Sequence, residues 1–375
     1  MDKMVFQSSP KPTLGVEIEL ALVDAKSMAL SSSILEIRKH IPKKFENSIK
    51  PELMQCYVEI NTGVCDTVAE ADADLREKAL ALQAIADDLG LRLHWTGTHP
   101  FSSWQDQQPT PDERYARLLD LLQDFGRRLV TFGLHVHVGV DSGDKAVMIC
   151  DRILRHLPTL LALSCNSPFW NGRTTGMQSH RSKIMDGLPT AGLPTFMRNW
   201  SEYVWLLNHL LETDFIRSIR DIWWDVRPHH NFGTVEVRCC DTLGNLDDCL
   251  TLAAVIQSLV QALSDRIDEG TYQHDCHPML VQQNKWRAAR YGLDAQLVDA
   301  YTFKSRSARE AAIELVDILS PTAERLDCLP YLERARDLAA GPTWADRQLK
   351  ALGETGDPVE AVRRATEASR LTTTA

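Results

Sequence analysis

The chain has 375 residues, of which 44% are hydrophobic, so it can bury a substantial core. Its formal net charge of -10 argues against a nucleic-acid partner, which would require clusters of Lys and Arg that the sequence lacks. We find no apolar run of about 18 residues to cross a membrane and no apolar signal-peptide core in residues 1–12, so we expect a soluble, cytoplasmic protein.

The first predicted strand, Gly15–Leu20, carries two carboxylates on one face. Side chains alternate along an extended segment, so Glu17 and Glu19 project together while the apolar residues cover the other side. Neighbouring carboxylates repel one another, and this repulsion would raise the free energy of the folded state unless a positive group lay between them. A divalent cation is the obvious candidate.

A second acidic strand surrounds Glu59 in the segment Gln55–Asn61, with Glu52 just upstream. Its polar residues again alternate with apolar ones, which is typical of a half-buried strand. A helix follows, with Thr67 as its expected N-cap and Gly90 as its stop signal.

Leu91–Thr98 is predicted to be a further strand, and 115–125 a helix. In the next strand, Leu134–Val140, the alternation places His135 and His137 on one face and valines on the other. Apolar spacing then predicts helix over 145–163, with a kink or break at Pro158.

Asn166–Pro194 is the longest irregular segment, rich in Gly and Pro, with cations at Arg173, Arg181 and Lys183. Loops of this length inside a compact domain are usually functional or disordered. The cations and neighbouring aromatic residues favour a function, although basic residues also occur on merely solvated loops.

Helix is predicted again over 195–211, followed by a fourth alternating strand, Gly233–Asp241, in which Glu236 and Arg238 share the polar face. Beyond Leu246 the pattern predicts helices, over 247–267, 281–291 and 297–319. No repeat or low-complexity linker divides the chain, so we expect a single domain, 1–375, with a helical C-terminal third.

Nine cysteines are scattered without C-x-x-C spacing, which predicts reduced, packed thiols rather than disulfides or a zinc site. The neighbouring Cys239 and Cys240 are expected on opposite faces of their strand.

Four alternating strands that bear acids, imidazoles and an arginine suggest one sheet whose polar face is an active site. Carboxylates with one or two imidazoles suit Mg²⁺ or Mn²⁺, whereas zinc prefers more nitrogen and sulfur. Magnesium is usually shared with substrate phosphates, most simply those of ATP, and Arg238 could neutralise a transferring phosphoryl group. No P-loop or Rossmann motif is present, so ATP would lie on the open sheet face.

The same four strands are compatible with other interpretations. An isolated outward-facing Glu is most often simply solvated, and a strand His is not always a ligand. The same sheet could serve a guanidino-kinase-like phosphotransferase, and His135 with His137 could hold the metal of an ATP-independent hydrolase.

Several segments, taken in order, resemble the bacterial carboxylate-amine ligases of the second glutamate-cysteine ligase family. They are GVEIEL, PELMQCYVEINTGVC, LHVHVGV, NSPFWNGR with SHRSKIMDGLPTAGLP, FGTVEVRCCDT, NKWRAARYGLDA and GPTWADRQ, which together span Leu14 to Gln348. Two positions depart from the family pattern, where Thr174 replaces an acidic residue and His180 replaces a Tyr.

The resemblance implies an α+β fold like the catalytic domains of glutamine synthetase and the guanidino kinases, with a curved, mainly antiparallel sheet and helices packed on its outer face. It implies ATP-dependent formation of an amide from a carboxylate and an amine through an acyl phosphate, with small-molecule substrates, and a homodimer is our default expectation. The implied magnesium ligands are Glu17, Glu19, Glu52, Glu59, His135, His137 and Glu236. Arg238 would contact the phosphates of ATP, and Arg173, Arg181, Arg287 and Arg290 would hold phosphate or a substrate carboxylate, with Arg181 and Arg238 acting in catalysis.

Overall fold

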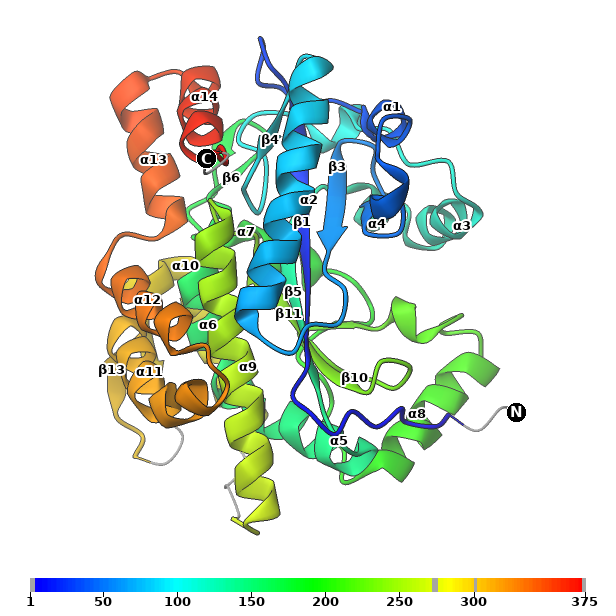
Figure 1. The fold of residues 1–375 in the computed structure, drawn as a ribbon, viewed down its shortest axis with the longest axis vertical. Coiled ribbons are helices and arrows are strands. Elements are labelled where there is room, and N and C mark those ends of the chain that lie inside the picture. The colour runs from blue at the N-terminus through cyan, green and yellow to red at the C-terminus, as the bar shows by residue number, and fades with distance from the viewer. Residues whose placement is uncertain (1–3, 272–275, 300–301, 373–375) are drawn as a thin grey trace.

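A computed structural model describes residues 4–271, 276–299 and 302–372. Its centre is an antiparallel sheet in the order β10-β11-β5-β1-β3-β2, to which β4 adds by pairing with the far end of β1. The seven strands are β1 (Leu14–Asp24), β2 (Ile49–Pro51), β3 (Tyr57–Asn61), β4 (Leu91–His94), β5 (Gly133–Gly139), β10 (Val226–His229) and β11 (Thr234–Asp241). The predicted mainly antiparallel sheet is therefore confirmed (Figure 1).

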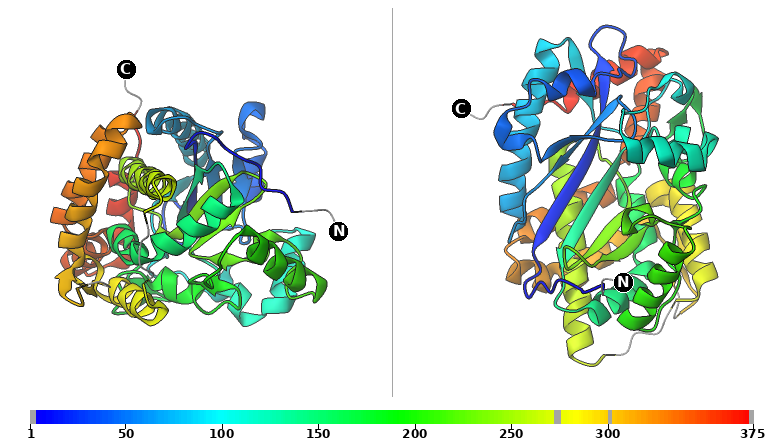
Figure 2. Two further views of the ribbon diagram at one scale, coloured as in Figure 1. Left: turned by 90° about the horizontal axis from the view of Figure 1, so that it is seen from below. Right: turned by 90° about the vertical axis from the view of Figure 1, so that its right-hand side faces the viewer.

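Helices cover one face of this sheet, and the long α2 and α9 cross it there (Figure 1). The helices are α1 (Ile34–Arg38), α2 (Val68–Asp88), α3 (Glu113–Leu122), α4 (Asp124–Arg127), α5 (Gly143–Arg152), α6 (Leu157–Ser164), α7 (His180–Met185), α8 (Trp200–Glu212), α9 (Leu246–Asp268), α10 (Pro278–Tyr291), α11 (Ala308–Arg325), α12 (Leu329–Ala340), α13 (Trp344–Thr355) and α14 (Pro358–Ala368). In the right-hand view of Figure 2 the central strands lie side by side with their broad faces turned toward the viewer, and α2 lies to their left.

The hydrophobic core lies between the sheet and these helices. Val16, Ile18 and Leu20 of β1 are at most 1% exposed and belong to the same apolar cluster as Leu75 of α2 and Leu252 of α9. Alternation in β1 therefore buries one face by the hydrophobic effect and leaves Glu17 and Glu19 on the other.

The length and apolar composition of α9 would suffice to cross a membrane, contrary to our expectation from the sequence, but 78% of its most apolar window is buried inside the protein. It packs against β5, α2 and α12. We therefore describe α9 as the core helix of this fold.

Local signals account for several helix ends. Thr67 Oγ1 accepts a hydrogen bond from the backbone N–H of Glu70 at 3.2 Å, which confirms the predicted N-cap of α2, and Gly90 adopts the left-handed conformation with φ of 69° just after its end. The predicted interruption near Pro158 lies before that residue, and Pro158 itself belongs to the first turn of α6. A proline is tolerated there because the backbone N–H groups of the first turn have no partner within the helix.

Two boundaries and two segments differ from the prediction. β4 ends at His94 instead of Thr98, and α8 begins at Trp200, where Asn199 accepts a hydrogen bond from Glu202 N, instead of at residue 195. Residues 297–307 were predicted to be helical, but residues 300 and 301 lie outside the described residues, and the described ones include the paired strands β12 (Gln296–Val298) and β13 (Ser305–Ser307). α11 begins only at Ala308, where Ser307 and Glu310 form a capping box. The irregular segment 166–194 contains α7 and the short strands β6 (Phe169–Trp170), β7 (Arg173–Thr174) and β8 (Ala191–Gly192), the last of which pairs with β9 (Trp223–Trp224).

Candidate active site

Strand register brings the predicted ligands together on the polar face of the sheet. Glu17 of β1 lies opposite His135 of β5, and His137 lies opposite Glu236 of β11. Glu19 lies opposite Glu59 of β3 in the same way. Residues paired across neighbouring strands point to the same face, so acids distant in sequence converge here.

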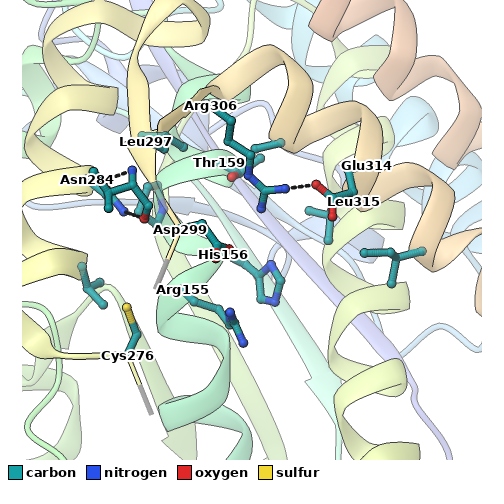
Figure 3. A pocket seen from close by; sticks show the side chains of 15 residues that line it. Arg155, His156, Thr159, Cys276, Asn284, Leu297, Asp299, Arg306, Glu314 and Leu315 are labelled. Atoms are coloured by element: carbon teal, nitrogen blue, oxygen red, sulfur yellow. Dashed lines mark hydrogen bonds and ion pairs between the residues drawn. The ribbon is translucent and has the colours of Figure 1, made fainter. Parts of the chain in front are cut away.

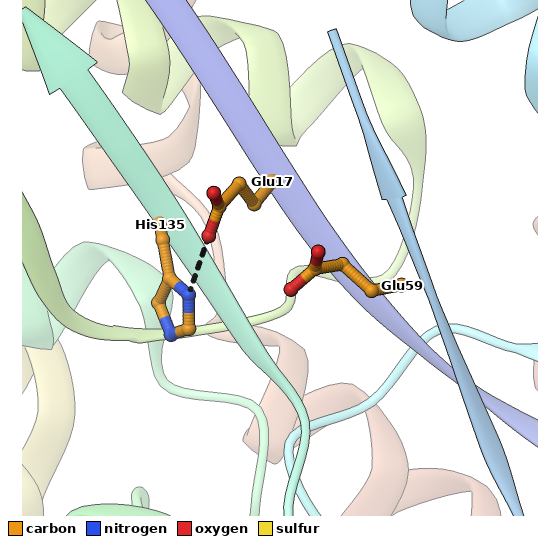
Figure 4. Close-up of side chains that lie close together, drawn as sticks. All are labelled: Glu17, Glu59 and His135. Atoms are coloured by element: carbon orange, nitrogen blue, oxygen red, sulfur yellow. Dashed lines mark hydrogen bonds and ion pairs between the residues drawn. The ribbon is translucent and has the colours of Figure 1, made fainter. Parts of the chain in front are cut away.

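Glu17 stands between two imidazoles. Its Oε2 lies 3.4 Å from His135 Nδ1, and its Oε1 lies 3.6 Å from His137 Nε2. Figure 4 shows Glu17 and Glu59 on adjacent strands, both directed toward His135. Two groups of possible metal ligands result, Glu17 with Glu59 and His135 and Glu17 with His137 and Glu236, and within each the ligand atoms lie within 4.8 Å of one another.

The donor set of both groups fits a hard divalent cation. Each offers two carboxylates and one imidazole, and substrate oxygens or water can complete such a shell around Mg²⁺ or Mn²⁺. Burial lowers the pKa of His135 to about 4, with repulsion by Arg238 acting in the same direction, so its imidazole is neutral at pH 7 and can bind a metal.

The carboxylates of this face repel one another. Burial raises the pKa of Glu59 well above its usual value, and the charges of Glu17 and Glu52 raise it further. Burial also raises the pKa of Glu52, with repulsion by Glu17 in the same direction. Although burial opposes ionisation of Glu17, its hydrogen bonds to both histidines hold its pKa well below the usual range. A cation bound between these groups would relieve the repulsion.

Glu236 is held by two arginines and is 1% exposed. Arg227 Nε donates to Glu236 Oε2 at 2.6 Å, and Arg238 forms an ion pair with Oε1 of the same carboxylate. Burial opposes ionisation of Glu236, but the two guanidinium groups keep its pKa well below the usual range. A metal ion at Glu236 would therefore compete with Arg238 for one carboxylate oxygen.

A bulge in β11 shapes this side of the site. The pairing with β5 shifts between Val237 and Cys240, so one extra residue is accommodated and the alternation changes phase. Our expectation that Cys239 and Cys240 point to opposite faces is therefore wrong, since both are buried and their Sγ atoms lie 3.8 Å apart. The same shift turns Asp241 toward the irregular segment.

Asp241 fixes the segment that carries Arg181. Its carboxylate accepts hydrogen bonds from Asn166 N at 3.0 Å, Ser167 Oγ at 2.6 Å and Ser179 Oγ at 2.9 Å. Arg181 N in turn donates to Ser167 Oγ, and its guanidinium lies 3.4 Å from His135 Nε2.

Gly133 makes the approach of Arg181 possible, because a Cβ at this position would lie 2.1 Å from Arg181 Nη2.

Glu19 and Glu52 line a pocket of about 90 Å³ beside the metal-ligand groups, together with His135, Arg181 and Arg238. Glu19 Oε2 accepts a hydrogen bond from Gly133 N at 2.6 Å, and the hydroxyl of Tyr115 donates a hydrogen bond to Glu52 Oε2 at 3.3 Å. These two carboxylates thus lie near the two groups without belonging to either.

The structure places the other predicted arginines elsewhere. Arg173 is exposed in β7, Arg287 donates to the carbonyl of Gln296, and Arg290 lies over the ring of Tyr291 at 4.8 Å. None of the three lines the pocket that contains Glu19 and Glu52. Among the two departures noted above, Thr174 is exposed and the ring of His180 lies 5.6 Å from that of Trp170.

Sequence reasoning missed Arg227, Tyr115 and Asp241. The sequence did contain a signal for Arg227, because this residue alternates with Val226 and Pro228 shortly before the Glu236 strand. No sequence pattern shows, however, that Arg227 lies opposite Glu236. Tyr115 comes from a helix far from the sheet in sequence, and Asp241 depends on the bulge.

A separate cavity of about 60 Å³ lies between α6, α10 and α11, where Arg306 and Glu314 form an ion pair (Figure 3). It is lined by His156 and Cys276 but by none of the converging carboxylates. We therefore assign the chemistry to the polar face of the sheet.

The pKa of Glu19 gives a first prediction. Burial raises this pKa to about 7, against the attraction of Arg181, so the folded protein retains a proton that the unfolded chain loses near pH 4.5. The folded state therefore loses stability as pH rises from 4.5 to 7, by roughly 3 kcal/mol in total. In EDTA at pH 8, Glu19→Gln should be more stable than the wild type by an amount of this order, and the difference should shrink at pH 5.5.

Urea denaturation at both pH values measures this difference, with Glu46→Gln as a control because Glu46 is exposed and lies outside the buried cluster. If Glu19→Gln is less stable than the wild type at pH 8, burial does not disfavour the ionised form of Glu19, and this description of the site is wrong.

Residues 13–368 match the family model "Glutamate-cysteine ligase family 2 (GCS2)". A putative glutamate–cysteine ligase 2 from Gloeobacter violaceus is 39% identical over 95% of this chain and 96% of its own length, and a putative glutamate–cysteine ligase 2-1 from Frankia alni is 44% identical over 87% of each chain.

Solved structures share the fold. A glutamate–cysteine ligase from Francisella tularensis in complex with AMP aligns with a TM-score of 0.73 over 97% of this chain and 89% of its own, at 14% identity. A bifunctional glutathione synthetase from Pasteurella multocida aligns with a TM-score of 0.69 over 96% of this chain and 52% of its own, also at 14% identity. The family match over nearly the whole chain and the identity to full-length relatives lead to one conclusion: the chain belongs to glutamate-cysteine ligase family 2.

Proposed function

We propose that this chain is an ATP-dependent carboxylate–amine ligase of the glutamate–cysteine ligase type, which activates a carboxylate as an acyl phosphate and then joins it to an amine. The observation that carries the proposal is the convergence of Glu17, Glu59, His135, His137 and Glu236 beside Arg181 and Arg238 on one sheet face. We also propose that it acts as one domain, 1–375, in the cytoplasm on small-molecule substrates, as a homodimer.

The two ligand groups would hold Mg²⁺, or Mn²⁺ in its place. The bound cation supplies positive charge that offsets the repulsion between the phosphates and the anionic carboxylate substrate. Glu17 belongs to both groups, so it would position both cations relative to each other. Thr234 Oγ1 lies 3.0 Å from His137 Nδ1 and fixes the orientation of that ring, which leaves Nε2 directed toward Glu17 and Glu236.

The arginines act on the substrates. Arg238 can donate to the oxygens of the transferring phosphoryl group when its pairing with Glu236 is relaxed, and Arg181, fixed through Ser167 and Asp241, can bind the carboxylate substrate. The carboxylate oxygen attacks the terminal phosphorus of ATP and ADP leaves. The amine lone pair then attacks the acyl carbon, the bond from that carbon to the phosphate oxygen breaks, inorganic phosphate leaves, and the nitrogen loses a proton.

Isotope transfer tests this sequence. We expect glutamate labelled with ¹⁸O in its side-chain carboxylate to yield one ¹⁸O atom in the released phosphate, with ADP release that requires both glutamate and an amine such as cysteine. Unlabelled phosphate would contradict the acyl phosphate. A stable phosphorylated amine would indicate a guanidino-kinase-like transfer, and turnover without ATP would indicate a hydrolase.

A further inference from the structure

The largest of the described cavities, about 580 Å³, adjoins the candidate active site. It lies between α3 and the segment 214–223, and it shares Arg114, Leu118 and Trp223 with the pocket that contains Glu19 and Glu52. Cavities of roughly 300–1,000 Å³ hold ligands of drug-like size. This space is therefore much larger than a cysteine molecule requires, and a ligand in it would lie beside the converging carboxylates.

The polar part of this cavity is rich in guanidinium groups. Arg217 is paired with Asp214 at 3.0 Å, whereas Arg220 is exposed and makes no ion pair within the part of the chain that the structure describes. The Nε of Arg114 is buried and has no hydrogen-bond partner among the described residues. Planar guanidinium groups of this kind bind carboxylates through paired hydrogen bonds.

Besides these arginines, three aspartates (Asp120, Asp214 and Asp221) and two hydroxyl residues, the lining is apolar. Phe215 is 71% exposed and Leu121 is 70% exposed, and both face this cavity together with Ile216 and Trp223. Large apolar side chains that remain exposed at a concave surface favour a ligand with an apolar body. The lining as a whole therefore suits a molecule that has both a carboxylate and a bulky apolar group.

The position of the cavity assigns it to one of the two substrates. The pocket that it adjoins contains His135, Glu19 and Arg181 but neither His137 nor Glu236. The opposite end, at His137, carries the exposed Phe232, whose ring stacks on His229 with centroids 4.2 Å apart. The arginine-lined cavity therefore adjoins the end of the site that contains Arg181, the residue proposed above to bind the carboxylate substrate, so a ligand in the cavity would lie next to that substrate.

We propose that this cavity holds the amine substrate, and that this amine is an α-amino acid whose apolar side chain is larger than that of cysteine. The inference rests on the proposed ligase function. The amino group would lie at the wall that the two pockets share, next to the acyl carbon. The carboxylate of the amine would bind Arg220, and the side chain would contact Phe215 and Leu121.

Four probes separate these features. With L-glutamate and ATP–Mg²⁺ held constant, L-phenylalanine should give amine-dependent ADP release with a kcat/KM at least about tenfold above L-cysteine, L-alanine or phenethylamine, because each of these lacks the large side chain or the carboxylate. Equal or faster turnover with cysteine, alanine or phenethylamine would overturn the proposal.

Direct binding separates this inference from the proposed function. Calorimetry with the full chain should show L-phenylalanine binding about tenfold or more tightly than phenethylamine and L-alanine, whether or not glutamate is the carboxylate substrate. Equal binding of the three, or none, overturns the inference. Binding with the expected preference but without any ADP release leaves the cavity assignment standing and contradicts the proposed glutamate-dependent reaction.

A variant locates the contact. Arg220→Gln should weaken phenylalanine binding about tenfold, leave phenethylamine binding unchanged and leave the KM for ATP unchanged. Arg364→Gln, on the distant helix α14, is the matched control because Arg364 is also an exposed arginine. Phenylalanine affinity within twofold of the wild type in Arg220→Gln would show that the carboxylate does not bind there.

Discussion

Replacing Glu236 by Gln lowers kcat/KM for ATP-dependent amide formation by about 100- to 1,000-fold, which is the usual cost of removing one preorganised charge from an active site. The carboxylate is 1% exposed and joins Arg227, Arg238 and His137, so its loss removes a possible metal ligand and releases two guanidinium groups at once. Coupled measurement of ADP release over a range of Mg²⁺ concentrations gives kcat and the apparent metal affinity.

Glu236→Asp is the matched control for this variant. It keeps the charge and shortens the side chain by one methylene, so we expect activity between those of the wild type and Glu236→Gln. Circular dichroism establishes that both variants fold. A folded Glu236→Gln protein with more than a tenth of wild-type activity would show that the reaction does not depend on this carboxylate.

Arg238→Gln should lower kcat by about 1,000-fold while it increases the affinity for Mn²⁺. The loss follows from the role proposed for Arg238 at the transferring phosphoryl group, where an arginine is worth about 10³ or more in rate. The gain follows from the ion pair between Arg238 and Glu236 Oε1, which a metal ion must displace. Removing the guanidinium relieves Oε1 of its ion pair with Arg238, although Arg227 Nη2 still donates to Oε1 at 3.3 Å and Arg227 Nε still holds Oε2.

The opposite signs of these two effects make this variant informative. Mn²⁺ affinity is measured by calorimetry without nucleotide, and kcat by ADP release. Arg238→Lys should retain part of the activity because it keeps the charge without the planar fork. Weaker Mn²⁺ binding in Arg238→Gln would mean that Arg238 does not compete with the metal for Glu236.

Alternation in the sequence was sufficient to predict the central strands, because a half-buried sheet must hide every second side chain. The faces of Glu17, Glu19, His135, His137 and Glu236 follow directly from it, and the register of β1, β5 and β11 places them side by side. The pairing of β12 with β13 was missed because the apolar residues of this segment fit a helical spacing equally well, and the capping box at Ser307 was the stronger signal.

The sequence could not predict which distant groups complete the site. The bulge after Val237 adds one residue to the strand and thereby turns Asp241 toward Ser167 and Ser179, and no alternation pattern reveals such an insertion. Arg227 contacts Glu236 because β10 pairs with β11, and the sequence alone does not show which strands are neighbours in the sheet. The arginine-lined cavity likewise depends on how α3 packs against the segment 214–223.

The convergence of acids around cations is tested most directly by counting bound Mn²⁺ in three proteins at pH 8. Because Glu17 belongs to both ligand groups and Glu59 to one, the wild type should bind two ions, Glu59→Gln one, and Glu17→Gln none at a concentration that saturates the wild type. Calorimetry or the paramagnetic resonance signal of free Mn²⁺ gives these numbers. Two ions bound to Glu17→Gln with wild-type affinity would contradict the account.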